Sequence, residues 1–234
     1  MSIKTCWVVT DGRAGMLNQA WGLAEELART EPGGSMDVVI KTISVGMPWR
    51  WLPSKLWVKP LACLTADSDR LAAPWPDLVI GCGRLTIPLG LAIGKASNGA
   101  SFTVQLQDPR INPEGFDLVV PPRHDHTGGA NIFETTGAVH RVTAQKLSSE
   151  ADKFRPTLDH LPHPRIAVLI GGSNKYYQLT PEIMQQLATR LVKLANDNNA
   201  GLMVTASRRT GTANEKVLRE ALSDIPVHFW DGQG

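Results

Sequence analysis

The chain has 234 residues, of which 42% are hydrophobic and 20% charged, and its formal net charge is +2. This composition describes an ordinary folded globular protein, and so small a charge argues against nucleic acid as the partner. Three cysteines without a C-x-x-C pair fit a reducing compartment, and the sequence shows neither a signal-peptide pattern nor an apolar run of roughly 18–20 residues, so we expect a cytoplasmic protein.

Short apolar runs alternate with helical patterns over the first 145 residues. The predicted strands cover 3–10, 36–45, 77–80, 101–107 and 117–120, with a sixth candidate at 131–135. A helical pattern with Ala20 and Leu27 on its apolar face follows the first run, and a second one covers 85–96. Strands that alternate with helices predict a parallel, doubly wound sheet.

A polar segment at 146–164 contains three prolines, a composition typical of a linker. It separates a first domain, 1–145, from a second, 165–234. The second domain opens with a buried-strand pattern at 166–170, followed by a helix that begins after Thr180. The sequence therefore predicts an α/β protein with two Rossmann-like, doubly wound parallel-sheet domains.

The second domain offers only three strand patterns, at 166–170, 201–206 and 227–230. In the usual order 3-2-1-4-5-6 the first strand lies inside the sheet, whereas with three strands it lies at an edge. An exposed apolar edge invites strand pairing. We expect the second domain to be truncated and the chain to be a fragment of a longer protein. The alternative is that 166–170 pairs with a strand of another chain.

Five motifs, taken together and in this order, resemble the elongated-mitochondria (mitochondrial fission) family. They are T-D-G-R-A-G-M-L-N-Q-A at Thr10–Ala20, Q-D-P-R at Gln107–Arg110, D-L-V-V-P-P-R-H-D at Asp117–Asp125, G-G-S-N-K at Gly171–Lys175 and S-R-R-T at Ser207–Thr210. The resemblance covers nearly the whole chain. Two consecutive Rossmann-like halves also look like a GT-B glycosyltransferase.

The resemblance implies a glycosyltransferase whose first domain takes an acceptor and whose second domain takes a nucleotide-sugar, with no tightly bound cofactor or metal. Two alternatives stay open. One is a non-catalytic scaffold that recruits partners, as the plant members imply. The other is a nucleoside-diphosphate-sugar epimerase with bound nicotinamide, which is disfavoured because the turn after the first strand has G-x-x-G spacing and lacks the G-x-G-x-x-G fingerprint.

Two loops of the second domain are candidates for binding the donor phosphates. Backbone N–H groups of Gly172, Ser173 and Asn174, with Gly171 and the Lys175 charge, are suited to a diphosphate. Arg208 and Arg209, beside Thr210, follow the next strand and would lie at the same sheet edge. The alternatives are a turn in which glycine supplies a positive φ and a solvated helix N-terminus.

The acceptor side is predicted at the carboxyl ends of the first domain's strands. Asp11 would be the base that takes the acceptor's proton, or else the residue that closes the turn. Other candidates for the cleft lie just after a strand or in the first turns of a helix. They are Arg13, Gln19, Arg84 and Arg110. Arg110 would bind an anionic acceptor in the interdomain cleft, or else form a turn with Asp108.

Two further features have weaker functional interpretations. His124 and His126 suggest a metal pair, but no third ligand has convincing spacing, so we expect no metal. Cys82 lies between two glycines without a visible base, so we expect a small buried residue rather than a nucleophile.

The segment 47–64 combines Trp49, Trp51 and Trp57 with lysine and arginine and is expected to be partly helical after Pro53. Tryptophan next to basic residues suits the surface of a membrane, on which the chain would be peripheral. The alternative is an ordinary segment that packs its tryptophans inward.

Overall fold

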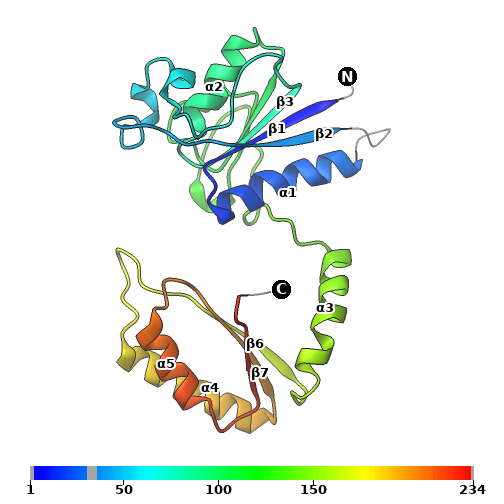
Figure 1. Cartoon of the computed structure of the whole chain (residues 1–234), viewed down its shortest axis with the longest axis vertical. Helices are drawn as coiled ribbons and strands as arrows, with labels where there is room; N and C mark the ends of the chain where they lie inside the picture. Colours follow the sequence, from blue (N-terminus) through cyan, green and yellow to red (C-terminus); the bar gives the residue numbers. More distant parts are fainter. Residues whose placement is uncertain (1–2, 31–35, 233–234) are drawn as a thin grey trace. The chain divides into compact units, whose positions relative to one another are not determined.

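The computed structural model describes residues 3–30 and 36–232, and the chain divides into two compact units, Met1–Thr143 and Ala144–Gly234. Both units are built on parallel sheets (Figure 1). The α/β class and the two Rossmann-like halves expected from the sequence are confirmed. The units are described separately below.

The first unit contains a five-stranded parallel sheet in the order β2-β1-β3-β4-β5. Its strands are β1 (Thr5–Thr10), β2 (Asp37–Thr42), β3 (Leu78–Cys82), β4 (Phe102–Leu106) and β5 (Leu118–Val120). The order reverses between β1 and β3. In such sheets ligands bind beyond the carboxyl ends of the strands, near this reversal.

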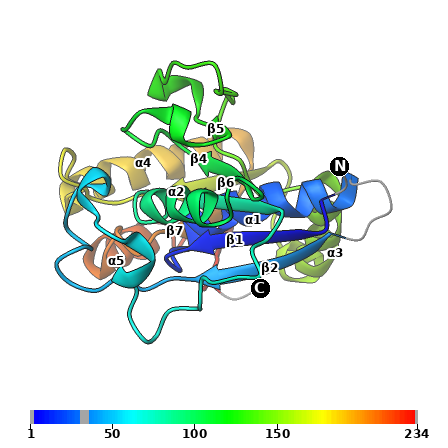
Figure 2. The same cartoon turned by 90° about the horizontal axis from the view of Figure 1, so that it is seen from above.

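The two faces of this sheet are covered by different elements. Alternate strand residues such as Val8 and Ile80 pack against Ala20 and Ala24 of α1 (Ala14–Thr30). The strand residues on the opposite face, such as Val9, pack against α2 (Ile87–Ala96) and the segment around Trp57. Figures 1 and 2 both show α1 running beside β1, whereas α2 packs against β3 and β4. Burial of both faces explains why the strands read as continuous apolar runs.

One predicted strand of this unit differs from the structure, whereas the expected helical segment is present. The candidate strand 131–135 forms only isolated bridges, Val119 with Ile132 and Pro122 with Thr135. The segment 47–64 is partly helical after Pro53, as expected, in the form of two short 3₁₀ helices, η1 (Ser54–Leu56) and η2 (Pro60–Cys63). Two further 3₁₀ turns, η3 (Pro113–Gly115) and η4 (Arg123–Asp125), flank β5.

The expected linker, 146–164, is largely the helix α3 (Ala144–Leu158). None of the residues of this helix is buried, and ion pairs such as Lys153 with Glu150 and Arg155 with Asp152 lie along it. Its apolar residues Leu147, Ala151, Phe154 and Leu158 do recur at helical spacing, but the polar composition of the segment and Pro156 give it the appearance of a linker.

The second unit contains the parallel sheet β6-β7-β8, formed by Arg165–Ile170, Gly201–Ala206 and Val227–Phe229. The helices α4 (Pro181–Asn198) and α5 (Thr212–Ala221) pack on one face of it, where Val168 and Leu202 are buried. β6 lies at an edge, as its three-strand pattern predicts. On the opposite face of β6, Leu169 is 80% exposed.

Candidate functional site

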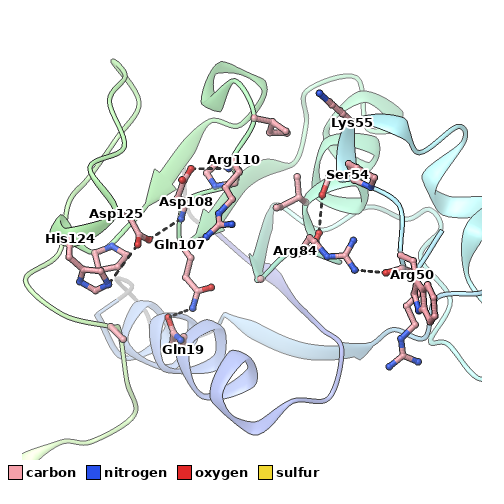
Figure 3. Close-up of a pocket in the computed structure, with 18 residues that line it drawn as sticks. Gln19, Arg50, Ser54, Lys55, Arg84, Gln107, Asp108, Arg110, His124 and Asp125 are labelled. Atoms are coloured by element: carbon pink, nitrogen blue, oxygen red, sulfur yellow. Dashed lines mark hydrogen bonds and ion pairs between the residues drawn. The ribbon is translucent and has the colours of Figure 1, made fainter. Parts of the chain in front are cut away.

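A cleft of about 980 Å³ opens at the carboxyl ends of the first unit's sheet (Figure 3). Its walls come from the segment after β2, the turn after β3, the turn after β4 and the η4 turn after β5. The polar and charged side chains of these walls are Gln19, Arg50, Ser54, Lys55, Arg84, Gln107, Asp108, Arg110, His124 and Asp125. The cleft therefore occupies the position at which doubly wound sheets bind ligands.

The turn after β4 carries backbone strain. Gln107 and Arg110 have φ values of 70° and 53°, which non-glycine residues rarely adopt. The Gln107 amide nitrogen Nε2 donates to Gln19 Oε1 over 3.3 Å, and the Arg110 backbone N–H donates to Asp108 Oδ1 over 2.8 Å. Strain of this kind concentrates at functional sites. The Asp108–Arg110 turn expected as an alternative is thus present, and Arg110 still lines the cleft.

The lining carries more positive than negative charge. Arg50, Lys55 and Arg110 are exposed, whereas the acidic residues are Asp108 and Asp125. Arg110 extends beside Gln107 in Figure 3. Guanidinium and ammonium groups in this setting are suited to a phosphate or carboxylate.

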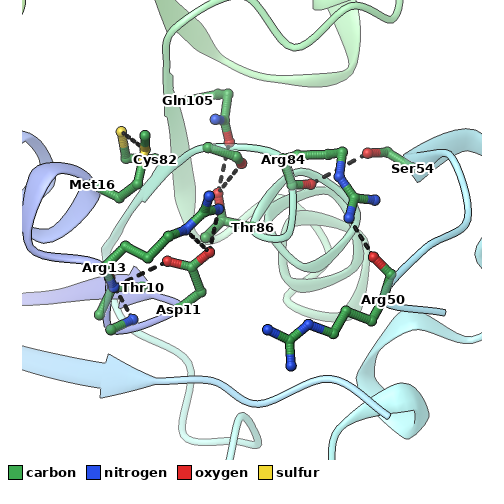
Figure 4. A network of polar contacts seen from close by, with 12 residues as sticks. Thr10, Asp11, Arg13, Met16, Arg50, Ser54, Cys82, Arg84, Thr86 and Gln105 are labelled. Atoms are coloured by element: carbon green, nitrogen blue, oxygen red, sulfur yellow. Dashed lines mark hydrogen bonds and ion pairs between the residues drawn. The ribbon is translucent and has the colours of Figure 1, made fainter. Parts of the chain in front are cut away.

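Arg84, a predicted cleft residue, lines the cleft and also holds its wall. Its Nη1 donates to the backbone oxygen of Leu52 over 2.8 Å, and its Nη2 donates to the backbone oxygen of Arg50 (Figure 4). Ser54 Oγ donates to the Arg84 carbonyl over 3.3 Å. Arg84 therefore fixes the segment that presents Arg50 and Lys55, because its donors are engaged by carbonyl groups.

Asp11 and Arg13 form a closed pair outside the cleft lining. Asp11 Oδ2 accepts from Arg13 Nε and Nη2 over 2.8 and 2.5 Å, and its Oδ1 accepts from the Arg13 backbone N–H over 3.3 Å. The Asp11 side chain is only 8% exposed. Hydrogen bonding to Asp11 raises the pKa of Arg13. This arrangement closes the turn after β1, which Gly12 permits with a φ of 78°.

In the second unit, the turn after β6 and the loop after β7 are joined. The backbone N–H of Ser173 donates to the Arg209 carbonyl over 3.3 Å, and Thr210 Oγ1 donates to the Gly171 carbonyl over 2.6 Å. Thr210 is buried, whereas Arg208 and Arg209 are exposed. The structure thus brings the two predicted phosphate-binding loops together at the carboxyl ends of β6 and β7. We call residues 171–175 and 207–210 the second-unit rim.

The rim differs from the expectation in two respects. The N–H groups of Ser173 and Asn174 are already used, since Asn174 donates to the Tyr177 carbonyl over 2.8 Å. The glycines are not needed for a positive φ, which neither Gly171 nor Gly172 has. Gly172 is needed for close approach, because a Cβ there would lie 2.0 Å from the Arg209 carbonyl carbon. The exposed cationic side chains of the rim are those of Lys175, Arg208 and Arg209.

The histidine and cysteine candidates have defined surroundings. His124 lines the cleft with its Nε2 3.7 Å from Asp125 Oδ1. In the described part of the chain, no group of three or more His, Cys, Asp or Glu side chains is placed to hold a metal ion. Cys82 is buried, and its burial raises the pKa of its thiol to about 12, so that it stays protonated near neutral pH.

Two of the three tryptophans expected at a membrane surface pack inward. Trp57 is 8% exposed in the apolar core beside α2, and Trp49 packs against the same core. The Trp57 Nε1–H donates to the Leu52 carbonyl over 3.4 Å, which satisfies the one polar atom of the ring. Trp51 is 78% exposed and lines the cleft. No helix among the described residues has the length and hydropathy of a membrane span.

The family model for mitochondrial fission ELM1 matches residues 14–234. The chain belongs to this family. It is 27% identical over 182 residues to the mitochondrial fission protein ELM1 of Arabidopsis thaliana, covering 68% of this chain and 42% of that protein. It is 23% identical over 247 residues to the uncharacterized protein RP120 of Rickettsia prowazekii, covering 91% and 67%. The chain thus spans less than half the length of the Arabidopsis family member.

Solved structures with a similar fold include two UDP-GlcNAc 2-epimerases. The enzyme from Neisseria meningitidis, solved with UDP-GlcNAc bound, matches with a TM-score of 0.51 and 14% identity over 98% of this chain and 72% of the enzyme. The enzyme from Methanocaldococcus jannaschii matches with a TM-score of 0.52 and 9% identity over 98% and 74%. At these identities the matches show a shared GT-B-like fold.

Sequence reasoning missed several residues of the cleft. The sequence places Arg50 and Lys55 in a segment interpreted as a membrane surface, His124 in a metal pair, and Asp125 only in a family motif. The position of His124 and Asp125 directly after a predicted strand could have indicated the cleft, because residues that follow β5 lie at the carboxyl end of the sheet. Arg50 and Lys55 gave no such signal, since an irregular segment carries them there.

Proposed function

We propose that the chain belongs to a glycosyltransferase of the GT-B type whose second unit binds the diphosphate of a nucleotide-sugar. The observation that carries the proposal is the second-unit rim, in which the loops after β6 and β7 are joined and Arg208 and Arg209 are left exposed. Two guanidinium groups and the Lys175 ammonium can neutralise a diphosphate leaving group, which gains charge as the glycosidic bond breaks.

The first unit would bind the acceptor in its cleft. Arg110 and Lys55 favour an acceptor that carries a phosphate or carboxylate, whereas Gln107 and Gln19 offer amide groups to hydroxyls. The strained turn at 107–110 and the bonds of Arg84 to Arg50 and Leu52 hold these groups in place, which favours binding to a preformed site.

Transfer requires a base near the acceptor hydroxyl. The hydroxyl oxygen forms the bond to the sugar's anomeric carbon as the bond from that carbon to the diphosphate breaks, and the base takes the proton. Asp11 can serve only if its pair with Arg13 opens. His124, whose side chain is 75% exposed and lies next to Asp125, is an accessible alternative within the cleft.

Incubation of the chain with UDP-GlcNAc separates the candidate reactions. That donor is the first choice because the similar Neisseria enzyme was solved with it bound. A transferase releases UDP only when a suitable acceptor is present, whereas an epimerase converts the sugar without one. We expect Arg208→Ala with Arg209→Ala to abolish turnover and Arg190→Ala, an exposed arginine on α4, to preserve it. Equal activity of the two variants would refute the proposed donor site.

A scaffold is the second candidate, and the open edge of β6 favours it. β6 pairs only with β7 in the described sheet, and Leu169 beside this edge is 80% exposed. A partner could add a strand there. Under this alternative, Leu169→Lys would weaken partner recruitment while the Arg208 and Arg209 substitutions would not. A nicotinamide-dependent epimerase would show a cofactor absorbance band, and we expect none.

A further inference from the structure

The segment 47–59 exposes large apolar side chains to solvent. Met47, Trp51, Leu56 and Val58 are 63%, 78%, 52% and 67% exposed. Four of the fourteen exposed large hydrophobic residues in the described part of the chain therefore lie within twelve positions. The segment lies in the part of the first unit that projects from the sheet in both views, coloured from blue to cyan (Figures 1 and 2).

This exposure coexists with firm anchoring on the other side of the segment. Trp57 is buried against the α2 side of the sheet, and Trp49 and Leu52 pack beside it. Arg84 holds the backbone oxygens of Arg50 and Leu52. The segment therefore divides its apolar residues into a packed set and an exposed set, and the packed set fixes the exposed one in place.

The charges of the segment identify the surface it fits. Arg50, Lys55 and Lys59 are all exposed, and 47–64 contains no aspartate or glutamate. The first acidic residue after it is Asp67. A neutral apolar partner would gain nothing from three cations, whereas an anionic bilayer binds both kinds of group, with apolar side chains at the acyl boundary and cations at the headgroups.

We propose that residues 47–59 dock the protein on an anionic lipid bilayer, with Trp51, Leu56 and Val58 entering the interface and Lys55 and Lys59 contacting lipid headgroups. These residues replace Trp49 and Trp57, which the sequence favoured and the structure buries. Trp51 and Lys55 also line the cleft, and the inference does not depend on the proposed transferase activity because lipid binding is measured without turnover.

Vesicle flotation with the full chain tests this proposal. We expect binding to phosphatidylcholine vesicles that contain roughly 30% phosphatidylglycerol and much weaker binding to phosphatidylcholine alone, since each basic residue near such a surface contributes roughly a fivefold gain in affinity. Lys55→Gln with Lys59→Asn should lower the partition coefficient roughly 30-fold. Leu56→Ser with Val58→Ser should lower it at least roughly tenfold.

The matched control is Phe133→Ser with Val142→Ser, which removes two equally exposed apolar side chains elsewhere on the first unit, 64% and 52% exposed. This control should float like the parent chain. Equal binding to both vesicle types, or equal loss in control and test variants, would overturn the proposal. So would a parent that is oligomeric by light scattering without lipid and becomes monomeric on Leu56→Ser with Val58→Ser, because the surface would then join copies of the chain.

Discussion

Gly172→Ala should separate the two loops of the second-unit rim. A Cβ at Gly172 would lie 2.0 Å from both the carbonyl carbon and the oxygen of Arg209 and 2.5 Å from the Thr210 nitrogen. Ordinary contacts begin near 3.4 Å, so the backbones must part by about 1.4 Å. Both partners are backbone, so no side-chain rotation relieves the clash. The Ser173 bond to the Arg209 carbonyl lies directly at this point of approach.

The loss of stability combines the steric clash with the hydrogen bonds that it weakens. Overpacking costs roughly 1–3 kcal/mol, and each broken hydrogen bond adds roughly 1 kcal/mol. With the Ser173 and Thr210 bonds both weakened, we expect the free energy of unfolding of the second unit to fall by about 3 kcal/mol. For a unit of about 90 residues this lowers the melting temperature by roughly 15 °C.

Calorimetry of Gly172→Ala and Gly171→Ala measures this effect with an adjacent control. No atom lies within 4 Å of a Cβ built on Gly171, and its φ is not positive, so Gly171→Ala should change the stability by less than about 0.5 kcal/mol. Hydrogen exchange should localise the Gly172→Ala effect to 165–210. Equal melting temperatures for the two variants would refute the reasoning that the loops meet at Gly172.

Three further predictions each concern the hydrogen bonds of one side chain. Thr210→Val removes the 2.6 Å hydrogen bond to the Gly171 carbonyl and should lower the free energy of unfolding, measured by urea denaturation, by roughly 1–2 kcal/mol. Thr210→Ser keeps the hydroxyl and should preserve the stability. Equal loss in both variants would contradict this. Asp77 accepts from the backbone N–H groups of Thr5 and Lys4, which hold its pKa below the ordinary value of 3.8. Because folding lowers the pKa of Asp77, its carboxylate stabilises the fold above pH 3.8, and this stabilisation is lost as the pH falls through the folded-state pKa. Asp77→Asn should therefore flatten the acid limb of a plot of unfolding free energy against pH. An unchanged acid limb would contradict this role. Arg84→Gln should raise the rate of tryptic cleavage at Lys55 roughly tenfold by freeing the carbonyls of Arg50 and Leu52, and wild-type protection would show that these bonds do not hold the segment.

The strands and their cores could be predicted because burial leaves a direct trace in sequence. β1, β3, β6 and β7 are continuous apolar runs that end at turn residues, and the edge position of β6 follows from the strand count. Helix α3 was missed although Leu147, Phe154 and Leu158 recur at helical spacing, because the polar composition and Pro156 outweighed that pattern. Composition alone therefore made it resemble a linker.

The site residues were predictable where they directly follow a strand. Because parallel strands share a direction, the loops after them lie at the carboxyl ends of the sheets, and these loops include Gln107–Arg110 and Ser207–Thr210. Long-range interactions decided the rest. Arg84 follows a strand too, but its donors reach carbonyl groups more than thirty residues earlier in the chain. Trp57 turns inward because the loop that carries it folds onto α2, which no local pattern shows.

Equilibrium binding of UDP and of uridine tests the proposed donor site most directly, since the two differ only in the diphosphate. We predict that the chain binds UDP at least tenfold more tightly than uridine, and that Arg208→Ala with Arg209→Ala removes this difference, each charge-assisted hydrogen bond being worth roughly a factor of ten. The Arg190→Ala control should retain it. Equal affinities for UDP and uridine in the parent chain, or a preference that survives loss of both arginines, would contradict a diphosphate site at the second-unit rim.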